Sequence, residues 1–448
     1  MSKRNFWIGS ILVGLLGALA ATYFVVEKRA VVEAAGVQAP RFEVDPFWPK
    51  PLPNHWVVGN IIGVSVDAQD HIWIIHRQGS LEAMEDYAVA NPPGPKRQPG
   101  VVEAECCAPA PAVLEFDEQG NLLKSWGGQD GDGYVWPLSN HGITVDYKGN
   151  VWIGGNAATR GVPAEEGLAP AGGPAGRGAG RGAAGGDGRG PAPGGPPLYH
   201  DSMVMKFTQD GKFLMQIGKS GQSKGSNDTA NLGRPAKMFI DPKTNELYVA
   251  DGYGNKRVIV YDAETGAYKR HWGAYGHKPD DTNLGRYNPN DPPAQQFRNP
   301  VHCAELSNDG LLYVCDRVND RIQVFKPDGT FVKEQILYKN TLGDGAVWDI
   351  AFSKDPQQKY IFLADGSNEK IHILDRESLQ VLTSFGDGGR QPGQFYAVHS
   401  IATDSKGNVF TTETYRGQRV QKFVNKGLAA VPKEDQGVLW PKTAKSSL

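Results

Sequence analysis

The sequence is poor in cysteine and has almost no net charge. Among its 448 residues there are only four cysteines, too few for a fold that depends on a disulfide framework. The 47 Lys and Arg residues nearly balance the 49 Asp and Glu residues, giving a net charge of −2, so we expect no nucleic-acid partner. Hydrophobic residues make up 40% of the chain, which excludes a protein that is disordered throughout.

Long hydrophobic runs are also absent, except for residues 6–26. This uncharged run of 21 residues is long enough to cross a bilayer and long for the core of a cleaved signal. Ala18-Leu19-Ala20 resembles a cleavage site, so residues 1–29 are interpreted as either a signal anchor or a signal peptide. Both interpretations predict an exported protein, periplasmic or extracellular, which contacts a membrane only through residues 6–26.

What the chain does contain is six copies of one strand pattern. An apolar run ends in Asp or Ser, and a turn and a second apolar run follow, as in Gly142–Asp146 and then Val151–Ile153. Third and fourth runs meet at Asp-x-x-Gly or Pro-Asp-Gly turns, in which glycine supplies a positive φ. Six such repeats predict an all-β, six-bladed β-propeller of four-stranded antiparallel blades over residues 59–424. The alternative, a β-sandwich, would not repeat one turn pattern six times.

Four segments lie outside this repeat pattern. Residues 30–58 are interpreted as a linker that contains the closing strand, Arg41–Asp45, because the sixth repeat lacks a fourth run. An insertion interrupts the first repeat at residues 82–112. A second insertion, residues 157–197, is almost entirely Gly, Ala, Pro and Arg and predicts a disordered loop. Residues 425–448 are interpreted as a C-terminal tail.

Histidine occurs at one repeat position in alternate blades. Five residues before the Asp or Ser that ends the first run, the six repeats carry Ile62, His141, Ala236, His302, Trp348 and His399. Because first strands line the channel of a propeller, His141, His302 and His399 are predicted to converge near its axis. Three neutral imidazoles with an open fourth position are the ligand set of a catalytic zinc ion, although copper and iron also accept imidazole. Alternatively, these histidines only bind water or neighbouring carbonyl groups.

A second repeat position, at the end of the second strand, carries Arg77 in the first blade and Arg317 in the fourth. Tyr253 follows the same position in the third blade, and Tyr415 in the sixth. Arginine binds carboxylates with two parallel hydrogen bonds, and a tyrosine near a metal and two arginines would have a lowered pKa and act as a base. Other arginines are interpreted as structural links between blades; these belong to Asn255-x-Arg257, Asn319-x-Arg321 and Gln418-Arg419.

These motifs resemble those of the peptidyl-α-hydroxyglycine α-amidating lyases, six-bladed propellers with NHL-type repeats. The resemblance covers residues 59–423 apart from the insertions and rests on Ile74-Ile75-His76-Arg77, His141-Gly142-Ile143, Asp251-Gly252-Tyr253, Pro300-Val301-His302 and Asp316-Arg317-x-Asn319-x-Arg321. It implies zinc on His141, His302 and His399, Tyr253 as the base, and Arg77 and Arg317 as substrate-binding residues.

The resemblance also implies a structural calcium ion, held by carbonyl groups matching Val64 and Ile143 and by an aspartate after the third histidine. In this sequence Ser400 stands at the position of that aspartate, so one of the expected calcium ligands is replaced. Ala397-Val398 likewise replaces the family's Met-Pro, so the wall of the pocket differs.

The function that these features predict is a zinc-dependent lyase that cleaves the C–N bond of an α-hydroxy-amide with a carboxylate group. A separate enzyme would introduce the hydroxyl group, because no copper monooxygenase domain is visible in the chain. One alternative is a zinc-dependent hydrolase of an ester or lactone. The other is a non-enzymatic NHL propeller that serves as a binding platform.

The cysteines fall into two pairs. Cys303 and Cys315 lie symmetrically about a predicted turn at Asp309, so they are expected to be cross-strand neighbours that form a disulfide or remain two small buried side chains. Cys106 and Cys107 are adjacent, and a ring between neighbours is strained. Each of them is therefore expected to pair elsewhere or to stay free.

Overall fold

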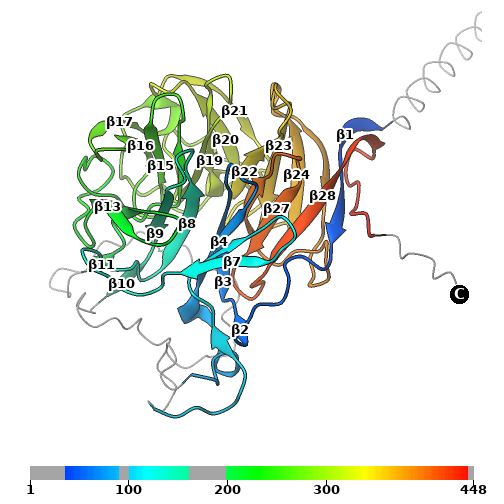
Figure 1. Ribbon diagram of the computed structural model, residues 1–448. Coiled ribbons are helices and arrows are strands. Elements are labelled where there is room, and N and C mark those ends of the chain that lie inside the picture. Colours follow the sequence, from blue (N-terminus) through cyan, green and yellow to red (C-terminus); the bar gives the residue numbers. More distant parts are fainter. Residues whose placement is uncertain (1–35, 90–99, 161–197, 442–448) are drawn as a thin grey trace, which may run out of the picture.

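The protein is described here by a computed structural model, which covers residues 36–89, 100–160 and 198–441. In this part of the chain, six four-stranded sheets surround a central axis (Figure 1). The predicted all-β, six-bladed propeller is therefore confirmed. The predicted anchor or signal helix and residues 161–197 of the Gly/Ala/Pro/Arg-rich insertion lie outside the described residues. Within the described residues, no helix is both long and apolar enough to span a membrane.

The first three blades are antiparallel sheets whose strands run in chain order from the axis outward. Blade 1 consists of β3 (Asn60–Val66), β4 (Ile72–Arg77), β6 (Val113–Phe116) and β7 (Leu122–Trp126). Blade 2 consists of β8 (Asn140–Val145), β9 (Val151–Gly155), β12 (Met203–Phe207) and β13 (Phe213–Gly218). Blade 3 consists of β14 (Lys237–Ile240), β15 (Glu246–Asp251), β16 (Arg257–Asp262) and β17 (Tyr268–Trp272).

The other three blades repeat this order, and the sixth takes its outer strand from the beginning of the chain. Blade 4 consists of β18 (Val301–Leu306), β19 (Leu312–Asp316), β20 (Arg321–Phe325) and β21 (Phe331–Ile336). Blade 5 consists of β22 (Asp349–Phe352), β23 (Tyr360–Asp365), β24 (Lys370–Asp375) and β25 (Val381–Phe385). Blade 6 consists of β26 (Val398–Thr403), β27 (Val409–Glu413), β28 (Val420–Val431) and β1 (Val37–Asp45).

The repeated aspartate at the end of the first strand fixes the turn to the second strand. In blade 2, Asp146 accepts hydrogen bonds from the backbone N–H groups of Lys148 and Asn150 at 2.9 and 2.8 Å. Its second oxygen accepts the indole N–H of Trp152 at 2.9 Å. Asp67 and Trp73 make the same contact in blade 1. One side chain thus holds both the turn and the strand that follows, which is why the pattern recurs along the sequence.

Closure of the ring joins the two ends of the chain. β1 pairs antiparallel with β28, from Val37 opposite Val431 to Asp45 opposite Lys422, and Figure 1 shows the blue and red strands side by side. The expected closing segment, Arg41–Asp45, lies within β1. Because β1 begins at Val37, it gives residues 425–431 a pairing partner, and β28 continues past residue 424, where the sequence placed the end of the propeller.

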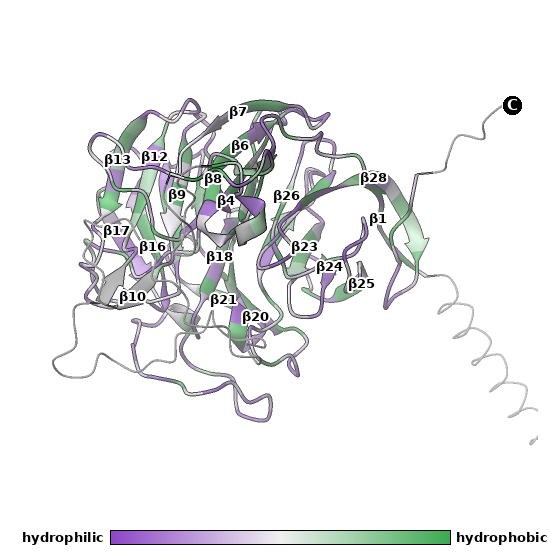
Figure 2. Ribbon diagram, turned by 90° about the horizontal axis from the view of Figure 1, so that it is seen from below, coloured by the Kyte–Doolittle hydropathy of each residue, from purple (hydrophilic) through white to green (hydrophobic). Residues whose placement is uncertain are grey.

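Hydrophobic side chains fill the space between neighbouring blades. Trp73 and Ile75 of blade 1 pack with Ile153, Met205 and Phe207 of blade 2, and all five are fully buried. Figure 2 shows the corresponding pattern, with hydrophobic residues gathered on the strands and hydrophilic residues on many of the loops. Packing between neighbouring blades therefore stabilises the ring, and the side chains that face the channel are not needed for this packing.

Short elements lie between the blades and within the insertions. In blade 1, η1 (Gln78–Ser80) follows β4 and precedes the insertion. The insertion itself contains η2 (Ala83–Glu85) and β5 (Ala108–Pro109), and β5 pairs parallel with β2 (Trp56–Val57). β10 (Ala158–Arg160), at the start of the second insertion, pairs with β11 (Leu198–His200), which directly follows that insertion. The two remaining short helices, in connections of blades 3 and 4, are η3 (Ala274–Gly276) and η4 (Arg317–Asn319).

The expectation for Cys106 and Cys107 is wrong, because the two residues form a disulfide with each other. The peptide bond between them is cis, and their Cα atoms are 3.1 Å apart. A trans peptide would hold the Cα atoms about 3.8 Å apart. The sequence argument had excluded this pairing because a ring between neighbouring cysteines is strained.

The second pairing is the one that the turn at Asp309 predicted. Cys303 and Cys315 face each other across β18 and β19, are completely buried, and form a disulfide with a Cα–Cα distance of 4.8 Å. Neither sulfur is therefore available as a thiolate ligand for a metal at the neighbouring His302.

We expect the Cys303→Ala, Cys315→Ala double variant to be less stable than the parent protein by roughly 2–3 kcal/mol, because the crosslink closes a loop with a sequence separation of 12. Urea unfolding of the oxidised proteins measures this difference. Alanine at Cys106 and Cys107 is the matched control and should have a smaller effect, since its loop has a separation of only one residue. Equal stability of the parent and the double variant would contradict the prediction.

Candidate metal centre and active site

Three histidines from alternate blades meet in the channel. His141 comes from β8, His302 from β18 and His399 from β26, and all three are buried. Their imidazole rings lie 4.8–5.2 Å apart between centroids, and one nitrogen atom from each ring lies within 4.8 Å of the others. The structure thus brings together the three residues that the repeat position singled out.

A β-bulge accompanies each histidine. His302 and His399 are the unpaired residues of the bulges in β18 and β26, while in β8 the unpaired residue is Gly142, next to His141. Bulges bend a strand and change the direction of a side chain. Gly142 has a φ of +69°, and a Cβ atom there would lie 2.3 Å from the carbonyl oxygen of Ala236, so only glycine fits.

Backbone carbonyl groups orient two of the rings. The Nδ1 atom of His141 lies 2.7 Å from the carbonyl oxygen of Ala236, and the Nδ1 atom of His302 lies 2.5 Å from that of Trp348. A carbonyl oxygen only accepts, so each Nδ1 carries the proton and each Nε2 keeps its lone pair. Each Nε2 atom therefore has a lone pair that can bind a metal ion.

The histidines remain neutral well below neutral pH. Burial, reinforced by the charge of Arg77, lowers the pKa of His141 to about 3. Burial and the charge of Arg317 hold the pKa of His302 well below its ordinary value. Burial and the neighbouring histidines do the same for His399. Neutral imidazole is the form that binds a metal ion.

The trio fits a metal ion. The Nδ1 atom of His399 is buried and has no hydrogen-bond partner among the described residues, a state that is costly unless something binds the ring. Three buried neutral imidazoles without a carboxylate ligand match the nitrogen-rich sites that zinc, copper and iron prefer. The residues can therefore hold a metal ion, and the choice among these metals belongs to the proposal below.

The hydroxyl group of Tyr253 lies directly at the trio. It is 3.0 Å from Nε2 of His141 and 3.0 Å from Nε2 of His302, and the side chain is buried. Tyr253 belongs to the turn after β15, and its backbone N–H donates to the carbonyl of Arg234. The guanidinium group of Arg234 donates in return to the carbonyl of Tyr253. The sequence argument did not identify Arg234, which belongs to no repeat position.

Arg317 approaches the same hydroxyl group from blade 4. Its Nη1 atom donates to the Tyr253 hydroxyl at 3.4 Å, and its Nη2 atom lies 3.5 Å from a carboxylate oxygen of Asp344. The guanidinium also lies over the indole ring of Trp348, 4.4 Å from the centroid. Trp348 holds in blade 5 the position that histidine holds in blades 2, 4 and 6. The sequence argument gave Trp348 no role, although this shared position was the signal for one.

Arg77 is half-buried, and other residues hold it. Its Nε atom donates to the carbonyl of Asn140 at 3.1 Å, and its Nη2 atom donates to the side-chain oxygen of Asn156 at 2.9 Å. Burial lowers its pKa, and its charge acts on His141 and His399. Arg77 is thus a fixed positive charge near the three histidines.

Tyr415, the tyrosine at the corresponding position of blade 6, is the other candidate for a base. Its side chain is 40% exposed, and the burial of the remainder raises its pKa to about 12.

The arginines that were interpreted as links between blades are instead each paired with an acidic residue of their own blade. Arg257 donates to Asp251 at 2.9 Å, Arg321 to Asp316 at 2.8 Å and Arg419 to Glu413 at 2.6 Å. These acidic residues also accept backbone N–H groups from the loops that lead into their own blades. The guanidinium groups of these three arginines therefore stabilise the blades, and we do not assign them to the candidate active site.

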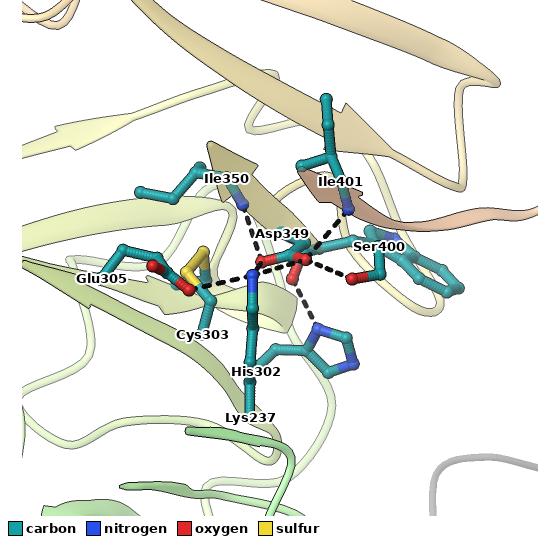
Figure 3. Close-up of a disulfide and its surroundings, with 10 residues drawn as sticks. Lys237, His302, Cys303, Glu305, Asp349, Ile350, Ser400 and Ile401 are labelled. Carbon is teal, nitrogen blue, oxygen red and sulfur yellow. Dashed lines mark hydrogen bonds and ion pairs between the residues drawn. A yellow bond between two sulfur atoms is a disulfide. The ribbon is translucent and has the colours of Figure 1, made fainter. Parts of the chain in front are cut away.

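The calcium site that the resemblance implies does not fit the residues present. Val64 and Ile143 do lie on the channel-lining strands β3 and β8, as the resemblance requires. However, the hydroxyl group of Ser400 donates to Asp349 at 2.7 Å, and the ammonium group of Lys237 binds the same carboxylate (Figure 3). A positive charge thus already lies at this level of the channel, where a calcium ion would need oxygen ligands.

Sequence comparison gives this site its context. Peptidyl-alpha-hydroxyglycine alpha-amidating lyase 1 of Drosophila melanogaster is 22% identical over 394 residues, which are 85% of this chain and 59% of that protein. Peptidyl-glycine alpha-amidating monooxygenase B of Xenopus laevis is 33% identical over 122 residues, 27% of this chain and 12% of that protein. Human NHL repeat-containing protein 3 is 23% identical over 233 residues, 49% of this chain and 58% of that protein.

The chain is a homologue of the amidating lyases and of NHL repeat proteins. The resemblance inferred from the motifs is thus confirmed. The identity is distant, and the chain spans less than two thirds of the length of each of these three relatives. No model of a known protein family matches the chain. The comparisons support a distant relationship to amidating enzymes and NHL repeat proteins. The site and the reaction are argued from this chain's own residues.

Proposed function

We propose that this amidating-lyase homologue is a zinc-dependent lyase that cleaves the C–N bond of an α-hydroxy-amide, such as a peptidyl-α-hydroxyglycine. The products are an amide and glyoxylate or a related carbonyl compound. One observation carries the proposal: the Tyr253 hydroxyl lies 3.0 Å from two of three converging neutral histidines and within reach of the Arg317 guanidinium. A metal site, a proton acceptor and a positive charge thus share one small volume.

His141, His302 and His399 would hold the zinc ion. When bound, zinc lowers the pKa of a hydroxyl group that it contacts. The protein's own residues perform the remaining steps. Tyr253 takes the proton of the substrate hydroxyl, and the guanidinium group of Arg317 lies beside the tyrosine hydroxyl at 3.4 Å. As the carbonyl forms and the C–N bond breaks, Tyr253 returns a proton to the departing amide nitrogen, which balances the reaction.

The two arginines act on the carboxylate end of the substrate. Arg77 is held rigidly by Asn140 and Asn156, and Arg317 is held by stacking on Trp348. Fixed guanidinium groups bind a carboxylate at low entropic cost because they do not have to be ordered first. The side chain of Asp344 is 24% exposed, and its carboxylate lies 3.5 Å from the Arg317 guanidinium. A substrate carboxylate could therefore replace Asp344 at this arginine.

The predicted surroundings follow from the same chemistry. A hydroxyl group on the carbon next to an amide nitrogen arises by oxidation, so we propose that a separate hydroxylating enzyme supplies the substrate. The two disulfides are typical of proteins that fold under oxidising conditions. Together with the uncharged run at residues 6–26, they support a proposed periplasmic or extracellular location.

The test is product analysis with a synthetic peptidyl-α-hydroxyglycine and the zinc-loaded protein. We expect equimolar amounts of glyoxylate and peptide amide, and loss of the activity when a chelator removes the metal. An ester or lactone substrate, tested in parallel, is expected to remain unhydrolysed. Acid release from that substrate without glyoxylate from the first would favour the hydrolase, and no turnover of either would favour a binding platform.

A further inference from the structure

One lysine of the larger channel cavity, Lys237, also lies next to the histidines. Lys237, the first residue of β14, lines both the small cavity next to the histidines and the larger cavity toward the other mouth of the channel. Its Nζ atom donates to the two carboxylate oxygens of Asp349 at 2.7 and 2.9 Å and pairs with Glu305 at 2.9 Å (Figure 3). This one charge therefore connects blade 3 with blades 4 and 5 across the channel.

The carboxylate of Asp349 is saturated by further donors. It accepts the hydroxyl group of Ser400 at 2.7 Å and the backbone N–H groups of Ile401 and Ile350 at 3.1 and 2.9 Å. Ser400 and Ile401 belong to blade 6, so four blades meet around the ion pair. A buried ion pair is favourable only when such additional hydrogen bonds satisfy both partners.

The position of this pair in the sequence is as specific as its position in space. Lys237 follows Ala236, whose carbonyl orients His141, and Asp349 follows Trp348, whose carbonyl orients His302. Ser400 follows His399. The ion pair therefore lies one residue further along the inner strands than the groups that shape the metal centre.

The charges explain why a cation is required there. Asp349 and Glu305 are two acidic side chains, 2% and 16% exposed, that approach the same point in the channel. Without a cation, two negative charges would face each other in a medium that screens them poorly. A divalent ion with oxygen ligands would solve the problem, and so does one lysine that reaches across from a third blade.

We propose that the Lys237 ammonium is the built-in cation of the channel and takes the place of a bound calcium ion, so that this protein binds no calcium there. The inference does not depend on the reaction proposed above, because its consequences appear in stability and in calcium binding. It also predicts that removal of the lysine creates a calcium site, since Asp349, Glu305 and Ser400 then offer oxygen ligands around the vacated position.

The experiment uses the full chain loaded with zinc. We expect calorimetric titration with CaCl₂ to show no binding to the parent protein, and calcium to leave its melting temperature unchanged. Lys237→Ala should melt lower by about 5 °C or more, and CaCl₂ should restore most of the loss. MgCl₂ should restore less, because Mg²⁺ is smaller and gives up its water reluctantly.

Two further variants keep the test decisive. Lys243→Ala removes a lysine at the cavity whose ammonium, among the described residues, donates to the carbonyl of Asn308, and it should leave melting and calcium response unchanged. Lys237→Arg keeps the charge and should remain indifferent to calcium. Calcium binding near this position in the parent protein, or a Lys237→Ala variant that melts like the parent, would overturn the proposal. If Lys237→Ala does not fold, titration of the parent alone decides.

Discussion

Replacement of His302 with alanine is expected to remove the metal and the activity of this protein while leaving the propeller folded. His302 supplies one of three imidazoles. Even residues that only hydrogen-bond to a metal ligand typically contribute about 10–100-fold to metal affinity. Loss of a direct ligand should therefore weaken zinc binding by at least about 100-fold and reduce turnover to background. Metal content after dialysis and the glyoxylate assay measure the two effects.

The reason for expecting an intact fold is that His302 contributes little to packing between blades. Its hydrogen-bond partners are the Tyr253 hydroxyl and the Trp348 carbonyl, both at the channel. The matched control is His271→Ala, which removes a half-exposed histidine of β17 and should keep zinc and activity. A His302→Ala protein with full zinc occupancy would show that the trio is not the metal site.

Replacement of Tyr253 with phenylalanine is expected to keep the metal and lose most of the turnover. The substitution removes only the hydroxyl group, which lies 3.0 Å from His141 and His302 but is not needed to hold a metal that already has three ligands. General acid–base groups contribute about 10²–10⁴-fold to rate, so kcat should fall within that range. Zinc content and kcat are measured on the same preparation of the variant and are compared with those of the parent protein.

Tyr415→Phe is the matched control for this variant. Tyr415 lies near the same arginines but is 40% exposed, and no hydrogen bond to the histidines is among its contacts. Its variant should remain within a few-fold of the parent. The reverse result, with Tyr253→Phe active and Tyr415→Phe inactive, would transfer the role of the base to Tyr415. Loss of zinc from Tyr253→Phe would instead make this tyrosine part of the metal site.

Repetition made much of the fold readable from the sequence. Each blade carries its own turn signal, as at Asp146 and Trp152, and these contacts are local, within six residues of each other. Local contacts repeat whenever the sequence does, so the number of blades and the cross-strand position of Cys303 and Cys315 followed from spacing, while the disulfide between them was one of two alternatives. The cis geometry between Cys106 and Cys107 left no such signal, and the prediction for that pair was wrong.

The sequence by itself determined the propeller and the candidates His141, His302, His399, Tyr253, Arg77 and Arg317, because equivalent residues of successive repeats must reach equivalent places around one axis. Only the tertiary structure decided which other groups meet them. Three contacts join residues of different blades or connections. They are the stacking of Arg317 on Trp348, the hydrogen bond from Arg234 to the Tyr253 carbonyl, and the ion pair of Lys237 with Asp349. Such contacts lie 19–112 residues apart along the chain and depend on how blades and connections pack in three dimensions, which no repeat pattern encodes.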